Sequence, residues 1–280
     1  MARTAEDVGL DSLWLGDHLL YRDAAHGSRG PWEAWSTLAG LAAVTTRVTL
    51  GPLVASTSFH NPAMLAKKAA TIDEMSGGRL VLGLGAGWNE VEYRAYGFPY
   101  DHRVSRFEEA FTIIRTLLRD GHIDFDGRFY QVRDCELVPR GPRPEGPPLL
   151  IGSNGERMLS IALPHVQAWN SWYSGFGNRL EEAPALLAQI DRAIVAADRD
   201  PSQIEKSLAL KVDLDGRTGA RDADGLPGYR APSGNPEQLA EVFRGFAALG
   251  VAELQLVLDP ISAAGIAALG PVLEALDRLS

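Results

Sequence analysis

The chain has 280 residues, 45% of them hydrophobic, and this length is sufficient for the core of a single domain over residues 1–280. Acidic residues outnumber basic ones 36 to 27, and no run of Lys and Arg is long enough to follow a phosphate backbone, which argues against nucleic acid as a partner. A lone cysteine, Cys135, cannot form an internal disulfide, and the sequence has neither an apolar stretch of about 20 residues nor a signal-peptide core, so we expect a cytoplasmic protein without a membrane partner.

Seven short apolar runs predict strands. The runs are continuous rather than alternating, which is typical of strands buried on both faces of a parallel sheet. The predicted strands are Ser12–Gly16, Val48–Val54, Leu80–Leu84, Leu149–Gly152, Val166–Asn170, Leu208–Leu214 and Glu253–Leu258. Segments with apolar residues at helical spacing lie between them, at Trp35–Thr45, Pro62–Met75, Arg106–Leu118, Leu180–Ala197 and Pro236–Leu249.

The alternation of strands and helices predicts a parallel sheet with right-handed crossovers. Two α/β architectures fit this order, an open doubly wound sheet and a closed (β/α)8 TIM-type barrel. Seven strands are one short of a closed barrel, and the missing strand would come first, because the chain opens on a predicted helix at Thr4–Val8. Either residues upstream are lacking or the first strand is degraded.

Two segments interrupt the alternation. Residues 119–148 predict a hairpin insertion that turns at Asp126-Gly127 and is followed by a return rich in Pro and Gly. Residues 215–236 predict a flexible loop, since this segment is too long and too polar for a simple connection.

Polar residues follow the first predicted strand directly, in the sequence "SLWLGDH", which ends on Asp17 and His18. In a parallel α/β barrel the active site lies at the carboxyl ends of the strands, where an imidazole can exchange protons near neutral pH. An isolated Asp-His pair is more often part of a loop than of a catalytic site. Unusual residues at other strand ends shift the balance towards catalysis.

Glycines mark two further strand ends. "LGLGAGWNE" has Gly83, Gly85 and Gly87, and "LLIGSNGERM" has Gly152 and Ser153, each just before a predicted helix. Backbone amides at such ends can face an anion, and two of them could hold one phosphate, although either could be only a tight turn. The dinucleotide pattern G-x-G-x-x-G would require glycine where Trp88 stands, which argues against NAD.

Tryptophans gather on or near the loops that follow strands. An aromatic rim of this kind suits a flat ring system, although we expect at least two of these side chains only to pack loops against the rim. Four of them are predicted to line the substrate pocket: Trp32, Trp88, Trp169 and Trp172. The six histidines show no metal-ligand spacing, so no metal site is predicted.

Several segments resemble the luciferase-like monooxygenase superfamily, which comprises oxidoreductases that use flavins or the deazaflavin coenzyme F420. The matching pieces run in family order from about Gly9 to Asn170. They include "LDSLWLGDH", "TTRVTLGPLV", "FHNPAMLAKKAATIDEMSGGRLVLGLGAGWNEVEYRAYG", "RFEEAFTIIRTL" and "PPLLIGSNGERML". This resemblance implies the closed barrel rather than the open sheet. It also implies a small-molecule substrate and a homodimer, for which the apolar helix faces near 34–43 and 64–75 could serve.

The resemblance also assigns roles to residues. His18 would be the catalytic acid/base, and Asp17 would bind the edge of the cofactor ring. A non-prolyl cis peptide bond is expected near Pro52-Leu53, with Val54 and Ala55 following it, and these four residues would bind the back face of the cofactor ring. The tail of the cofactor would approach Gly85, Ala86, Gly87, Gly152 and Ser153.

Three functions remain open from the sequence. The first is hydride transfer between coenzyme F420 and a small, apolar organic substrate. In the subgroup that oxidises sugar phosphates an acid follows the glycine pair, whereas here Trp88 stands at that position, which argues against phosphorylated glucose. The second is an FMN-dependent monooxygenase or reductase, and the third is a flavin-binding barrel without turnover.

Overall fold

The computed structural model describes residues 1–23, 27–214, 231–259 and 261–279. The chain forms two compact units, residues 13–152 and residues 1–12 with 153–280. We call them the 13–152 unit and the 153–280 unit. Residues 24–26, 215–230, 260 and 280 lie outside the described residues, so most of the predicted flexible loop at 215–236 does too.

The 13–152 unit contains the strands that carry most of the predicted site. Strand β1 pairs with β4, and β5, β6 and β9 are parallel neighbours in that order. Leu50 of β4 also forms an isolated parallel bridge with Leu80, which lies two residues before β6. The elements are β1 (Ser12–Leu15), β2 (Tyr21–Asp23), β3 (Gly27–Arg29), α2 (Ala34–Val44), β4 (Thr49–Pro52), β5 (Ala55–Ser56), η1 (Thr57–Phe59), α3 (Pro62–Ser76), β6 (Leu82–Gly85), α4 (Glu90–Tyr96), α5 (Arg103–Asp120), β7 (His122–Asp126), β8 (Gln131–Glu136) and β9 (Leu149–Gly152).

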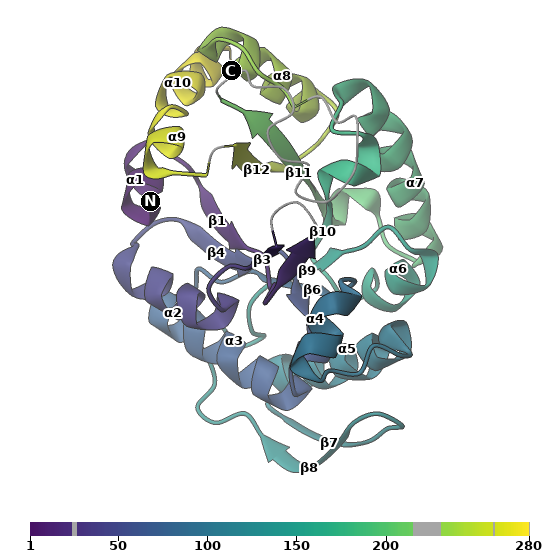
Figure 1. Ribbon diagram of the computed structural model, residues 1–280. Helices are drawn as coiled ribbons and strands as arrows, with labels where there is room; N and C mark the ends of the chain where they lie inside the picture. Colours follow the sequence, from purple (N-terminus) through teal and green to yellow (C-terminus); the bar gives the residue numbers. More distant parts are fainter. Residues whose placement is uncertain (24–26, 215–230, 260, 280) are drawn as a thin grey trace. The chain divides into compact units, whose positions relative to one another are not determined.

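Helix α3 shows why these segments form helices where they do. The side chain of Asn61 accepts a hydrogen bond from the Met64 amide at 3.1 Å, and Pro62 occupies the first turn, where its missing N–H is not needed. The helix ends at Gly77, whose φ of 68° is the left-handed conformation that glycine adopts most readily. Its buried face includes Leu65 and Ile72, and α2 lies alongside it (Figure 1).

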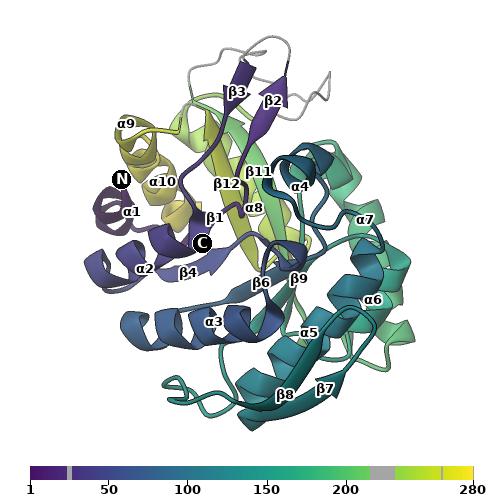
Figure 2. The ribbon, with the colours of Figure 1, turned by 60° about the horizontal axis from the view of Figure 1, so that its bottom comes forward.

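Two hairpins extend this unit. The predicted hairpin insertion is present as β7 and β8, which pair antiparallel beside α5. The Glu109 carboxylate on α5 accepts hydrogen bonds from the amides of Arg128, Phe129 and Tyr130 at 2.9–3.0 Å, which fixes the turn of the hairpin. The second hairpin, β2 with β3, was not predicted from the sequence, and Figure 2 shows it standing out next to α4.

The 153–280 unit holds the other three strands. Strands β10, β11 and β12 are parallel neighbours, with Ser207 of β11 opposite both Asn170 and Glu253. Helices α8 and α10 lie side by side (Figure 1), and α8 begins with a reciprocal cap between Asn235 and Gln238. The elements are α1 (Ala2–Asp7), α6 (Glu156–Ala162), β10 (Ala168–Ser171), η2 (Tyr173–Phe176), η3 (Leu180–Glu182), α7 (Ala183–Ala196), η4 (Pro201–Gln203), β11 (Glu205–Asp213), α8 (Pro236–Ala248), β12 (Glu253–Asp259), α9 (Ala263–Ala267) and α10 (Gly270–Leu279).

All seven predicted strands are present, and their bounds differ from the predicted ones by no more than three residues at either end. The prediction of a single domain over residues 1–280 stays a prediction. In the parts of the chain that the structure describes, no helix is both long enough and apolar enough to cross a membrane.

Candidate active site

Asp17 ties the end of β1 to the segment that follows β4. Its side chain is almost fully buried, and its Oδ2 accepts a hydrogen bond from the Ser56 amide at 2.9 Å and lies 2.8 Å from Nε2 of His60. The ring of His60 in turn meets Trp35 edge to face. Asp17 is therefore held by groups of the protein itself. Its predicted contact with the edge of a cofactor ring stays a prediction.

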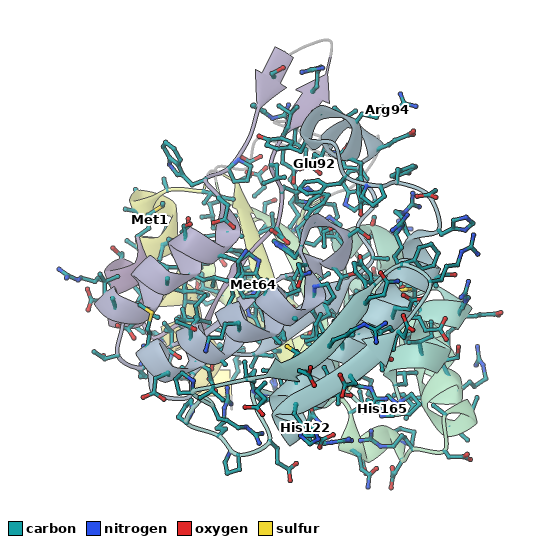
Figure 3. All side chains as sticks on the ribbon, turned by 90° about the horizontal axis from the view of Figure 1, so that it is seen from below. Met1, Met64, Glu92, Arg94, His122 and His165 are labelled. Carbon is teal, nitrogen blue, oxygen red and sulfur yellow. The ribbon has the colours of Figure 1, made fainter. Side chains whose placement is uncertain are left out.

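His18 faces in another direction and meets a buried acid. Its Nδ1 lies 2.9 Å from Oε2 of Glu92, whose side chain is 1% exposed, while the His18 side chain is 23% exposed. The second carboxylate oxygen, Oε1, accepts hydrogen bonds from the amides of Leu19 and Leu20 at 2.5 and 3.0 Å. One carboxylate thus holds the imidazole and the backbone next to it. Figure 3 labels Glu92 on helix α4, beside the β2–β3 hairpin.

The surroundings of Glu92 favour its charged form. Burial raises the pKa of this carboxyl, but the hydrogen bonds from His18, Leu20 and Leu19 outweigh burial and hold the pKa below its ordinary value of 4.5. An ionised carboxylate only accepts hydrogen bonds, so Nδ1 of His18 must carry the proton that it donates. In the neutral ring the lone pair is then on Nε2, for which no hydrogen bond is found among the described residues.

A second buried network joins the ends of β5 and β6. The hydroxyl of Tyr93 donates to the carbonyl of Ala86 at 2.8 Å and lies 3.1 Å from Oγ of Ser56. Burial raises the pKa of Tyr93 above its ordinary value of 10.0, although the hydrogen bond with Ser56 opposes this, so the phenol is neutral at neutral pH. Gly87 packs directly against this network, and only glycine fits there, because a Cβ would lie 2.0 Å from the Tyr93 oxygen.

Glycines at the ends of β6 and β9 surround the side chain of Val54. A Cβ on Gly85 would lie 2.7 Å from Cγ2 of Val54, and one on Gly152 would lie 2.8 Å from Cγ1. A non-prolyl cis peptide bond joins Leu53 to Val54. The sequence placed that bond near Pro52-Leu53, and it lies one residue further along the chain. The glycines have a packing role here, since they make room for Val54.

Aromatic rings flank the imidazole of His18. The ring of Tyr21 lies 4.8 Å away between centroids, and Trp88 meets the imidazole edge to face at 5.7 Å. Trp88 is 57% exposed, and its neighbour Asn89 donates to the carbonyl of Leu20 at 3.1 Å, which holds the two loops together. Trp32 is 89% exposed and has no ring contact among those found in the described residues.

The remaining predicted residues belong to the 153–280 unit. Ser153 accepts hydrogen bonds from the Gly155 amide and, through its carbonyl, from the indole of Trp169 at 2.7 Å. Trp169 is fully buried and packs in the core of its unit, whereas Trp172 is 37% exposed and packs on Tyr173. The predicted contacts of Ser153 with a cofactor and of both tryptophans with a substrate stay predictions.

Four residues of the 13–152 site were missed by sequence reasoning: Tyr21, Ser56, Glu92 and Tyr93. Glu92 lies in the acidic segment "NEVEYR" and looks like a surface residue, since its partner His18 is 74 residues earlier. The only local signal is its place in the first turn after a glycine-rich strand end. Among the described residues, no group of three or more His, Cys, Asp or Glu side chains could hold a metal ion.

Comparison with known proteins identifies the family. A model of the luciferase-like monooxygenase family matches residues 1–217. The chain is 30% identical over 218 residues to an F420-dependent glucose-6-phosphate dehydrogenase of Amycolatopsis mediterranei, a match covering 75% of this chain and 63% of the relative. It is 34% identical over 160 residues to a 5,10-methylenetetrahydromethanopterin reductase of Archaeoglobus fulgidus, covering 57% of this chain and 44% of the relative.

The chain therefore belongs to the luciferase-like monooxygenase family, as its sequence motifs predicted. The matches span less than two thirds of the length of these two relatives. A solved structure, an F420-dependent secondary alcohol dehydrogenase in complex with an F420-acetone adduct, matches 98% of this chain and 93% of its own with a TM-score of 0.80 at 19% identity. This similarity confirms the predicted fold class, the (β/α)8 TIM-type barrel.

Proposed function

We propose that this chain is an oxidoreductase that exchanges a hydride between coenzyme F420 and a small, apolar organic substrate, with His18 as the acid/base. The names of the Amycolatopsis mediterranei relative and of the solved structure described above support the cofactor. One observation supports the role of His18 above all others. Its Nδ1–H is held by a buried carboxylate, and Nε2 remains to take or give a proton.

The strand ends of the 13–152 unit fit a flat deazaflavin ring. The side chain of Val54 is partly exposed and packs against the backbone of Gly83, Gly85 and Gly152. A Cβ at any of these three glycines would collide with it. An apolar side chain presented in this way is a suitable support for the face of a ring. For the anionic tail of the cofactor we retain the backbone of the 13–152 unit at Gly85, Ala86, Gly87 and Gly152.

Coenzyme F420, when bound, accepts or returns the hydride, and the protein must handle the accompanying proton. For an alcohol substrate, a hydride leaves the carbinol carbon, the hydroxyl proton goes to Nε2 of His18, and a carbonyl forms. The imidazolium produced in this way is stabilised by the Glu92 carboxylate at 2.9 Å. In the reverse direction the same nitrogen returns the proton to the carbonyl oxygen.

The groups around His18 favour an apolar substrate. Tyr21 and Trp88 flank the imidazole, and the charged side chain in contact with it is an acid, Glu92. A phosphorylated sugar would need cations or amide donors at the same place, and the carboxylate would repel it. We therefore expect secondary alcohols or ketones of modest size to react and glucose 6-phosphate to react poorly.

A second candidate, an FMN-dependent monooxygenase or reductase, is favoured by the family model that matches the chain. Titration of the purified protein with coenzyme F420 and with FMN, followed by fluorescence, distinguishes the two candidates. Micromolar binding of coenzyme F420 together with reduction of the cofactor by an alcohol is the expected result. Binding of FMN alone would contradict the proposal, and binding of either cofactor without turnover would indicate a flavin-binding barrel.

We also infer a homodimer. Apolar side chains on the outer faces of α2 and α3 support this inference, among them Val44, Met64 and Met75, which are 45–55% exposed. Figure 3 labels Met64 on α3. Light scattering after gel filtration should give twice the chain mass, and replacing Met64 by Glu should shift the protein towards the monomer.

A further inference from the structure

The carboxylate of Glu92 is divided between two tasks. Oε1 satisfies the amides of Leu19 and Leu20, which would be enough to anchor this loop to α4. Oε2 is directed at Nδ1 of His18 and at no other group found among the described residues. An acid with 1% exposure of its side chain loses its contact with water, so both oxygens need partners, and the second partner is the imidazole.

Both the imidazole and the backbone that carries it are thereby fixed by one side chain. The amides held by Oε1 belong to the two residues directly after His18, so the carboxylate restrains the loop and the ring together. Edge contact with Trp88 and the tilted contact with Tyr21 limit the ring from two further sides. A ring held on three sides has one orientation, and Nε2 points away from Glu92.

We infer that Glu92 is a positioning residue, which sets the orientation and the tautomer of His18 so that Nε2 is the proton acceptor. The inference rests on the proposed role of His18 as acid/base. Among the residues that the structure describes, the titratable groups found against the imidazole are Glu92 of α4 and Tyr21 of β2. On its own segment, Asp17 is engaged through Oδ2 with Ser56 and His60.

The substitution Glu92→Gln separates positioning from simple anchoring. The amide oxygen of Gln still accepts from Leu19 and Leu20, so the loop stays anchored. Its amide nitrogen donates to Nδ1 of His18 instead of accepting from it, which moves the ring proton to Nε2. A ring protonated at Nε2 cannot accept the substrate proton there. The rate of hydride transfer should fall on the order of 10²-fold or more, with unchanged affinity for the cofactor.

The matched control is Glu90→Gln on the same helix. Glu90 is partly exposed and pairs with Arg94 at 2.7 Å, so its replacement removes a charge of the same kind, in the same first turn, without touching His18. A second pair of proteins, His18→Ala with and without Glu92→Gln, shows whether Glu92 acts through the imidazole. If it does, Glu92→Gln has no further effect on the rate in the His18→Ala protein.

The tautomer is read directly by NMR with isotope-labelled histidine, and the His18 signals are those missing from the His18→Ala variant. We expect Nδ1–H in the wild type and in Glu90→Gln, and Nε2–H in Glu92→Gln. An Nε2–H tautomer in the wild type would overturn the inference. So would an unchanged rate in Glu92→Gln, or an equal fall in rate with and without His18. Lack of turnover in a wild type with the expected tautomer would contradict the proposed function instead and leave the positioning of His18 supported.

Discussion

Gly87 offers a sharp test of the packing beneath the candidate site, through the substitution Gly87→Ala. Its φ is 74°, a left-handed conformation that costs a residue with a Cβ about 1–2 kcal/mol. The added methyl group would also lie 2.0 Å from the Tyr93 hydroxyl and 2.2 Å from Oγ of Ser56. Relieving such crowding in a packed interior costs about 1–3 kcal/mol more.

Gly97→Ala is the control for the conformational cost alone. Gly97 is the C-cap of α4, which begins three residues after Gly87; its φ is 77°, and a Cβ there would meet no atom within 4 Å. We therefore expect about 1–2 kcal/mol of destabilisation for Gly97→Ala and about 2–5 kcal/mol for Gly87→Ala. The difference between the two variants, about 1–3 kcal/mol, measures the crowding against Tyr93 and Ser56.

The assay is urea unfolding followed by circular dichroism, with the free energy of unfolding extrapolated to water. Both variants should retain the slope of the wild type, because neither changes how much surface is exposed on unfolding. Equal destabilisation by the two substitutions would refute the reasoning, since it would mean that no buried contact between Ser56, Tyr93 and Ala86 exists beneath Gly87.

Three further predictions concern interactions that hold the 13–152 unit together. Arg143→Ala should destabilise the protein by about 3 kcal/mol in urea unfolding, because it removes the ion-pair partner of the fully buried Asp73 carboxylate. The control is Arg133→Ala, which breaks an exposed ion pair with Asp126 and should change the free energy of unfolding by less than about 1 kcal/mol. Glu109→Ala should speed hydrogen exchange at the amides of Arg128, Phe129 and Tyr130, which lose their shared acceptor; unchanged exchange there would argue against the described turn. The folded-state pKa of Glu92 lies below its ordinary value of 4.5, so the stability that the ionised carboxylate contributes is complete above about pH 4.5 and is lost as the pH falls through the folded pKa. The variant Glu92→Gln has no such carboxylate, so its free energy of unfolding should fall less than that of the wild type as the pH is lowered. An identical pH dependence of stability in the two proteins would contradict this prediction.

The strands could be predicted from the sequence because their apolar runs are local signals. Leu149–Gly152 has the predicted bounds, and β11 extends three residues before the predicted start because Glu205 and Lys206 continue the ladder with polar side chains. The β2–β3 hairpin was missed for the opposite reason. Its residues Tyr21 and Gly27–Arg29 are polar or small and carry no alternating apolar pattern.

The site was predictable only in part, since its key contacts join distant parts of the chain. Asp17 and His18 stood out because a polar pair ends an apolar strand. Nothing local separates the buried Glu92 from the partly exposed Glu90 two residues earlier, because the difference arises from contact with His18 in the folded chain. The cis bond could be placed from the sequence only to within one residue, because an apolar sequence such as "GPLVAS" contains no feature that fixes its register.

A single-turnover comparison of the wild type with His18→Ala tests the central claim most directly. Each protein is saturated with oxidised coenzyme F420, occupancy is matched by fluorescence, and reduction of the cofactor by a small secondary alcohol is followed by absorbance. The account predicts equal cofactor binding and a rate that is lower in His18→Ala on the order of 10²-fold or more. Equal rates in the two proteins would show that His18 does not transfer the proton.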